Sequence, residues 1–197
     1  MKKKILAVLS VVLCLSILGG VTAAYFTDKD TAHNVITTGN VDIALVEQRL
    51  VNGKLEDYPT GPVGGILPAT QASKIVSVKN TGTGDAWVRI RVDKKVELDR
   101  SAPEALPAGE IPENMIGLNI DTRYWTQEGD WYYYRQPLTA GRTTEPLFDT
   151  VSFDKDMGNA YQGCKLHVNV SAQAVQSKNN PMPASGNPAD IPGWPNP

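Results

Sequence analysis

The sequence predicts an all-β fold, a jelly-roll-like β-sandwich, and three observations favour it. Apolar and polar residues alternate with a period of two in several segments, which is typical of half-buried strands. Turn-forming residues separate these segments, and no long stretch has helical periodicity. At least seven strands are expected, enough for two packed sheets. The pattern does not separate a jelly roll from an immunoglobulin-like topology, although the cysteine and tryptophan spacing of a true immunoglobulin domain is absent.

The first 24 residues are predicted to be a secretory signal peptide. Lysines occupy positions 2–4, residues 5–18 form an uncharged apolar run, and small residues follow it. Thr22 and Ala24 suit the −3 and −1 positions of a cleavage site, so cleavage between Ala24 and Tyr25 is expected. An uncleaved anchor is the weaker alternative, because a membrane span needs about 20 apolar residues.

Composition places the mature chain among acidic proteins without internal disulfides. Removing the signal leaves 16 basic against 21 acidic residues, a net charge of −5. This charge argues against nucleic acid as a partner, since its binding depends on Lys and Arg contacts to phosphate. Cys14 leaves with the signal, so Cys164 has no partner within the mature chain. Its position on the apolar side of a strand pattern favours a buried thiol over pairing between chains.

The mature chain is predicted to begin with a polar lead and then enter its first strand. Residues 25–34 have no helical periodicity, and the strand is expected at residues 41–46, where Val41, Ile43 and Leu45 take the apolar positions. Two carboxylates in the lead, Asp28 and Asp30, are too few for a good calcium site, so a solvated segment is the favoured interpretation.

Further strands follow at turn-rich intervals across the predicted domain, residues 25–176. Asn52-Gly53 predicts a type I′ hairpin turn. Two more hairpins are expected, one joining residues 75–79 to 86–93 and one joining residues 125–128 to 131–134. In the former, positions 86, 88, 90 and 92 are expected inside, and Trp87, Arg89, Arg91 and Asp93 on the surface. Strands at 147–153 and 164–176 complete the set.

The last segment, residues 177–197, has a different composition. Six prolines follow Asn180, among Asn, Ser and Gly residues. Such a segment buries little apolar surface, and disorder is predicted for it.

No arrangement of residues predicts catalysis, a cofactor or a metal. The histidines of the chain, His33 and His167, lack the His-Glu-x-x-His pattern of zinc proteases. His167 falls on the polar side of the last strand, where a surface histidine is the simpler interpretation. No serine-hydrolase elbow, phosphate loop or dinucleotide motif occurs. The chain is therefore not expected to be an enzyme.

The most ligand-like group is aromatic. Trp125 and residues 131–134 could form a platform for sugars. Adjacent strand residues point to opposite faces, however, so about half of them must enter the core. Cross-strand packing is the favoured interpretation.

Several segments together resemble one family, the TasA/camelysin-like proteins. The signal end at residues 19–28, the run 38–43, the segments 76–82 and 86–90, and the later segments 131–138, 146–148 and 172–176 are similar to that family in order and content. The resemblance covers about residues 1–176, and the tail lies outside it.

The resemblance implies a protein secreted by a Gram-positive bacterium, located in the extracellular matrix or at the cell surface, and released by a dedicated signal peptidase. It implies a biofilm matrix protein that polymerises with itself, with an accessory matrix protein as a further candidate partner. In that family the N-terminal segment can insert as a donor strand into the next subunit. The matching positions lie within residues 25–45, with 25–40 as the candidate donor segment. The candidate assembly residues are Tyr25, Phe26, Val35, Ile36, Val41, Ile43 and Leu45.

Two alternatives remain open at the level of sequence. The camelysin branch carries a metalloprotease name, which implies a secreted metalloprotease, although no zinc motif supports carrying it over. A surface module that binds carbohydrate or host molecules is the other, and it depends on the aromatic group.

Overall fold

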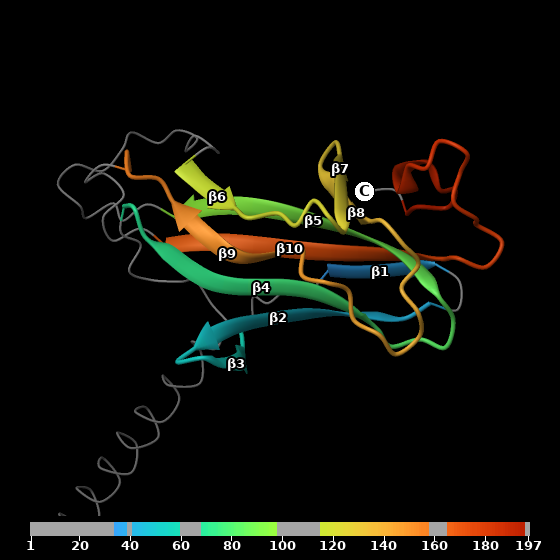
Figure 1. Ribbon diagram of the computed structural model, residues 1–197, viewed down its shortest axis with the longest axis horizontal. Coiled ribbons are helices and arrows are strands. Elements are labelled where there is room, and N and C mark those ends of the chain that lie inside the picture. The colour runs from blue at the N-terminus through green and yellow to red at the C-terminus, as the bar shows by residue number, and fades with distance from the viewer. Residues whose placement is uncertain (1–33, 39–40, 60–67, 98–114, 158–164, 196–197) are drawn as a thin grey trace, which may run out of the picture. The chain divides into compact units, whose positions relative to one another are not determined.

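The computed structural model describes residues 34–38, 41–59, 68–97, 115–157 and 165–195 (Figure 1). The chain divides at Thr31 into two units, and the fold described below is that of the second. Several predictions, namely the signal peptide, its cleavage between Ala24 and Tyr25, and the positions of Phe26, Asp28, Asp30, His33 and Cys164, fall outside the described residues.

Within the described residues, ten strands form two five-stranded sheets. The first sheet has the order β1 (Asn34–Thr38), β10 (Lys165–Gln176), β5 (Ala86–Glu97), β8 (Trp131–Tyr134) and β7 (Trp125–Glu128). The second has the order β3 (Lys54–Asp57), β2 (Ile43–Val51), β4 (Gln71–Asn80), β9 (Phe148–Phe153) and β6 (Ile116–Leu118). The strand pairs are antiparallel except for β1 and β10, which are parallel. The predicted all-β sandwich is confirmed.

The core lies between the inner faces of the sheets and follows the period-two pattern. In β5 the predicted inward residues Ala86, Val88 and Ile90 are fully buried, and Val92 packs beside them. The alternate positions of β10 meet side chains of β2, β4 and β9 across this space, together with Trp125, Tyr134, Leu138, Leu147 and Phe148. Burial of these apolar side chains is the main stabilising term, at roughly 25 cal/mol per Å².

Two predicted turns form as expected. Asn52 and Gly53 have φ angles of 50° and 78°, both in the left-handed region that a type I′ turn requires, and they join β2 to β3. The aromatic hairpin pairs β7 with β8 around Gly129. As the alternation predicts, it divides its aromatics, with Trp125 and Tyr134 in the core and Trp131 and Tyr133 on the opposite side.

The predicted hairpin between residues 75–79 and 86–93 is wrong. These strands, β4 and β5, lie in different sheets, so the turn between them is a corner that carries the chain from one sheet to the other. Asn80 is fully buried at this corner. Its amide donates to the carbonyls of Gly84 (2.8 Å) and Leu138 (2.9 Å), and its side-chain oxygen accepts from the Gly82 amide (3.0 Å).

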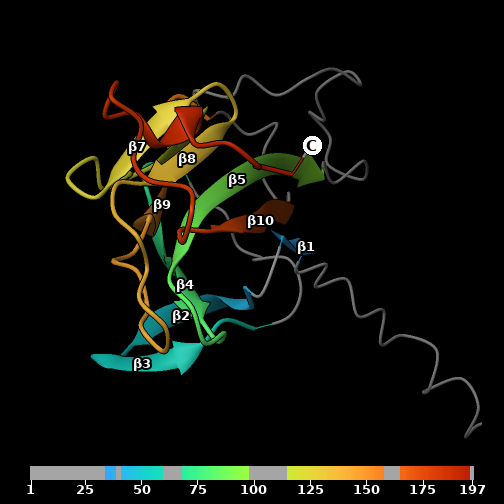
Figure 2. The ribbon, with the colours of Figure 1, turned by 90° about the vertical axis from the view of Figure 1, so that its right-hand side faces the viewer.

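The predicted disorder of residues 177–197 is also wrong for the part that the structure describes. Residues 177–195, here called the strap, lie on the outer face of the first sheet (Figures 1 and 2). The strap contains the 3₁₀ turn η3 (Pro188–Asp190). Because the strap covers that face, Trp87 and Arg89 are buried, whereas the sequence pattern places them at the surface.

Candidate assembly site

The edge strand β1 is the element on which the candidate site depends. It pairs in parallel with β10 over five residues, from Asn34 opposite Ser171 to Thr38 opposite Val175. The other side of β10 is fully paired with β5. The edge of β10 is therefore covered from Ser171 to Val175 by a short segment that precedes β2 in the chain (Figure 1).

The chain is anchored immediately after β1. Val41 and Ile43 are 5% and 4% exposed, and β2 begins at Ile43 in the opposite sheet. The carbonyl of Asp42 accepts from the amides of Thr81 (2.9 Å) and Gly82 (3.0 Å) at the corner between β4 and β5. A Cβ at Gly82 would lie 2.8 Å from the Asp42 nitrogen, so glycine allows this close approach. These contacts fix the chain at Asp42, directly before β2.

The backbone ladder alone holds β1 weakly. A parallel edge strand of five residues makes roughly one hydrogen bond per residue, each with a net worth of about 1 kcal/mol. Ordering the same backbone costs about 1–2 kcal/mol per residue. The hydrogen bonds of the ladder therefore do not exceed the cost of ordering the backbone of β1.

Tyr25 and Phe26 lie outside the described residues, and the other predicted assembly residues fall into two groups. Val35 and Ile36 lie on β1, opposite Ala172 and Gln173. Val41, Ile43 and Leu45 instead contribute to the protein's own core. Ile43 and Leu45 pair with Asn80 and Val78 of β4. Residues 41–45 thus help to form the core of this chain, whereas β1 lies at an edge of the first sheet.

Three hydrogen-bonded side chains lie in a row across the outer face of the first sheet, and the sequence analysis did not predict this row. Gln173 of β10, Arg89 of β5 and Tyr133 of β8 are in register across three neighbouring strands. Arg89 donates to the Gln173 oxygen (2.9 and 2.5 Å) and to the Tyr133 hydroxyl (3.2 Å). Its guanidinium also lies 4.1 Å from the Trp131 ring centre. Each residue reads separately as a surface position, and only the pairing brings them together.

A buried ion pair lies on the second sheet. Lys74 is 4% exposed, and its Nζ lies 2.7 Å from Glu47 Oε1 and 3.8 Å from the ring centre of Tyr58. Burial lowers the pKa of Lys74, and the Glu47 carboxylate opposes that shift. Burial and the same carboxylate raise the pKa of Tyr58. Lys74 is thus paired with Glu47 and packed against Tyr58, which fits a structural role in the second sheet.

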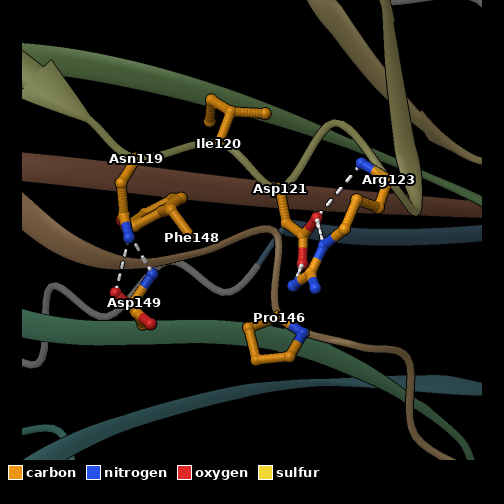
Figure 3. Close-up of a pocket in the computed structure, with 7 residues that line it drawn as sticks. All are labelled: Asn119, Ile120, Asp121, Arg123, Pro146, Phe148 and Asp149. Carbon is orange, nitrogen blue, oxygen red and sulfur yellow. Dashed lines mark hydrogen bonds and ion pairs between the residues drawn. The ribbon is translucent and has the colours of Figure 1, made fainter.

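A surface pocket is lined by Asn119, Ile120, Asp121, Arg123, Pro146, Phe148 and Asp149 (Figure 3). Its polar groups bind one another. The Asp121 carboxylate accepts from Arg123 Nε (2.9 Å) and Nη2 (2.7 Å), and Asn119 donates to Asp149 (2.6 Å). The Arg123 contact lowers the pKa of Asp121. Asn119, Asp121, Arg123 and Asp149 are thus paired with one another within the pocket.

The donor groups of the described residues do not favour metal binding. Among these residues, no group of three or more His, Cys, Asp or Glu side chains is arranged to hold a metal ion. His167 lies half-buried on β10 and does not meet such a group. In the described part of the chain, no helix has the length and apolar character needed to cross a membrane.

Comparison with known families supports the resemblance predicted from the sequence. Residues 1–97 match the family described as camelysin metallo-endopeptidase, a range that includes β1 to β5. The resemblance to camelysin and TasA-like proteins is thereby confirmed. No curated protein and no solved structure matches the chain.

Proposed function

We propose that this camelysin-like chain is a secreted structural subunit that assembles into fibres of the extracellular biofilm matrix by donating β1 to a neighbouring copy. The observation that carries the proposal is the parallel pairing of β1 with the edge of β10. When β1 leaves this edge, β10 exposes unpaired N–H and C=O groups that another strand can satisfy.

The exchange needs no new interface. A β1 from a second copy can take the same register, Asn34 opposite Ser171 through Thr38 opposite Val175, so each copy recovers from a neighbour the strand pairing that it gives up internally. The anchor at Asp42 keeps β2 in place during the exchange. Each subunit then donates one strand and accepts another. Such head-to-tail contacts do not close on themselves, and they produce a filament.

Signal removal fits this mechanism as an assembly switch. The predicted cleavage after Ala24 frees the end of the chain that carries β1. In the uncut precursor, the apolar signal would hold this end at the membrane. We therefore expect precursor that keeps residues 1–24 to polymerise more slowly than chain beginning at Tyr25.

Deletion of residues 25–38 tests the proposal. Chain beginning at Tyr25 should form fibres visible by electron microscopy, and the deletion variant should remain monomeric because it has no strand to donate. Near-ultraviolet circular dichroism checks that the variant keeps its core. Fibres that form at the same rate without residues 25–38 would refute donation by this segment.

A second candidate function follows from the family description, which names a metallo-endopeptidase. The described residues hold no donor group that fits a catalytic zinc ion, so we assign no step to a metal. Metal analysis combined with a casein assay, with and without chelator, separates the two functions. Stoichiometric zinc with chelator-sensitive cleavage would favour the protease, and their absence would favour the structural subunit.

A further inference from the structure

The strap contacts the outer face of the first sheet through two anchors, Ile191 and Trp194, and Met182 packs against the same apolar cluster. The first is Ile191, which is 2% exposed and packs against Trp87 of β5 and Val175 of β10. Trp87 and Val175 are direct cross-strand partners. At the start of the strap, the Trp87 indole also donates to the Asn180 carbonyl (2.8 Å).

The second anchor is Trp194. Its ring meets Tyr133 edge to face at 5.5 Å and 74°, and lies 4.9 Å from the Arg89 guanidinium. The guanidinium therefore contacts Trp194 as well as Trp131. Arg89 Nη2 also donates to the Pro195 carbonyl (2.6 Å). Aromatic and arginine contacts of this kind provide much of the affinity at protein interfaces.

The surface that receives these anchors is built by the sheet. Val175 and Trp87 form one cross-strand row, and the Gln173, Arg89 and Tyr133 row is its neighbour on the same face. Gln173 and Tyr133 hold Arg89 through hydrogen bonds that do not involve the strap. The receiving surface is therefore organised before a ligand arrives.

The strap is likewise organised by its own bonds. The Asn187 side chain accepts from the Ala189 amide (3.1 Å) and caps η3, and the Ser185 hydroxyl donates to Asp190 (2.7 Å). The Trp194 indole donates to the Pro188 carbonyl (3.1 Å). Residues 184–186 between the anchors and the sheet are exposed. A short segment with its own structure, seated on a prepared aromatic surface, has the form of a peptide ligand on its receptor.

We propose that this outer face is a docking site for a proline-flanked peptide with an Ile-x-x-Trp pair, and that it takes this segment from a second copy of the chain as well as from its own. The proposal is independent of strand donation by β1. The tether gives the internal strap an effective concentration in the millimolar range, so the internal strap fills the site first. If the internal strap cannot reach the docking site on its own chain, the strap of a second copy binds there instead.

A peptide with the sequence of residues 185–195 tests the site. The receptor is the full mature chain carrying Ile191→Ser and Trp194→Ala, whose own strap lacks both anchors. Fluorescence anisotropy should show that the peptide binds this variant at least about tenfold more tightly than wild type, in which the site is occupied. A Trp194→Ala peptide should bind neither. Failure of the peptide to bind the folded variant, or equal binding to variant and wild type, would overturn the proposal.

A second experiment uses the wild-type strap, so a folding defect of the Ile191→Ser and Trp194→Ala variant cannot affect it. A protease site inserted after Ser185 allows the strap to be cut in the folded wild-type chain. The cut strap should stay bound and then exchange with labelled peptide, but not with the Trp194→Ala peptide. A strap fragment that does not exchange would contradict the proposal.

Deletion of residues 184–186, made in chain that also lacks residues 25–38 so that it has no β1 to donate, tests the second copy as the source. The shortened connection loses about 10 Å of reach, so the anchors should dock on a partner and the chain should elute as a dimer. Adding Trp194→Ala to the deletion should restore the monomer. A deletion variant that stays monomeric, or a dimer that persists after Trp194→Ala, would refute exchange between copies.

Discussion

Replacing Asn80 by alanine should weaken both the fold and the anchor behind β1. Asn80 lies at the corner between the sheets with no exposed surface, and its side chain makes three hydrogen bonds to backbone groups. One of these is with Gly82, whose amide also holds Asp42 at the base of β1. The substitution removes all three bonds at once.

The expected loss in the free energy of unfolding depends on which of the backbone groups bonded to Asn80 keep another hydrogen-bond partner. The Leu138 carbonyl still accepts from the Ala86 amide (3.0 Å), and the Gly82 amide still donates to Asp42 (3.0 Å). The Gly84 carbonyl loses the Asn80 amide, but Gly84 is only half-buried. Three bonds at a net 0.5–1.5 kcal/mol each give a loss of roughly 2–4 kcal/mol in the free energy of unfolding. Asn80→Asp should cost at least as much, since its carboxylate would face two carbonyl oxygens.

Urea unfolding followed by tryptophan fluorescence measures this loss. Thr83→Ala is the matched control, because Thr83 is exposed in the same turn, and its effect should stay within about 0.5 kcal/mol. A loss below about 1 kcal/mol for Asn80→Ala, with an unchanged dependence on urea, would show that the corner does not depend on this side chain.

Three further predictions concern the anchor, the buried ion pair and the exposed hairpin. Gly82→Ala should lower the free energy of unfolding by about 1–3 kcal/mol, since its Cβ would lie 2.8 Å from the Asp42 backbone nitrogen; no change by urea unfolding would exclude the tight contact. As pH rises towards 10.5, wild type should gain stability relative to Lys74→Met. The pKa of Lys74 is lowered in the folded protein, so the unfolded state binds more protons in that interval. If the difference in the free energy of unfolding between the two proteins does not change with pH, the desolvation of Lys74 is contradicted. Leu50→Thr and Leu55→Thr should each change the free energy of unfolding by less than about 0.5 kcal/mol, because these cross-strand neighbours are 53% and 59% exposed; a larger loss in thermal unfolding would place them in a contact.

The sequence predicted the inner faces of the sandwich well, because that signal is local. A strand that covers the core must alternate, and the alternation of β5 and β10 is readable from each strand separately. The type I′ turn at Asn52 and Gly53 was equally readable, since few residues adopt positive φ at both positions.

Partner strands were harder to predict. β4 and β5 both alternate and are joined by a short polar connection, which fits a hairpin and a corner equally well. The corner is marked by contacts with residues distant in sequence, such as the bond from Asn80 to Leu138 and the bond from Gly82 to Asp42. The parallel pairing of β1 with β10 is also non-local and left no local pattern.

Two errors on the outer face share one cause. The strap is rich in Pro, Asn, Ser and Gly, so its composition predicted disorder, and without it Trp87 and Arg89 were expected at the surface. The strap is held by a few isolated apolar residues, Met182, Ile191 and Trp194. An average over composition hides such isolated residues.

The measurement that tests the central claim most directly is assembly with β1 locked to its own β10. Asn34 and Ser171 are register partners, so Asn34→Cys with Ser171→Cys, in a Cys164→Ser background, should form a disulfide. With fibre growth followed by electron microscopy and light scattering, the oxidised chain should stay monomeric, while the reduced chain and each single-cysteine chain should form fibres. Fibres that grow equally fast from the oxidised and reduced forms would contradict assembly by exchange of β1.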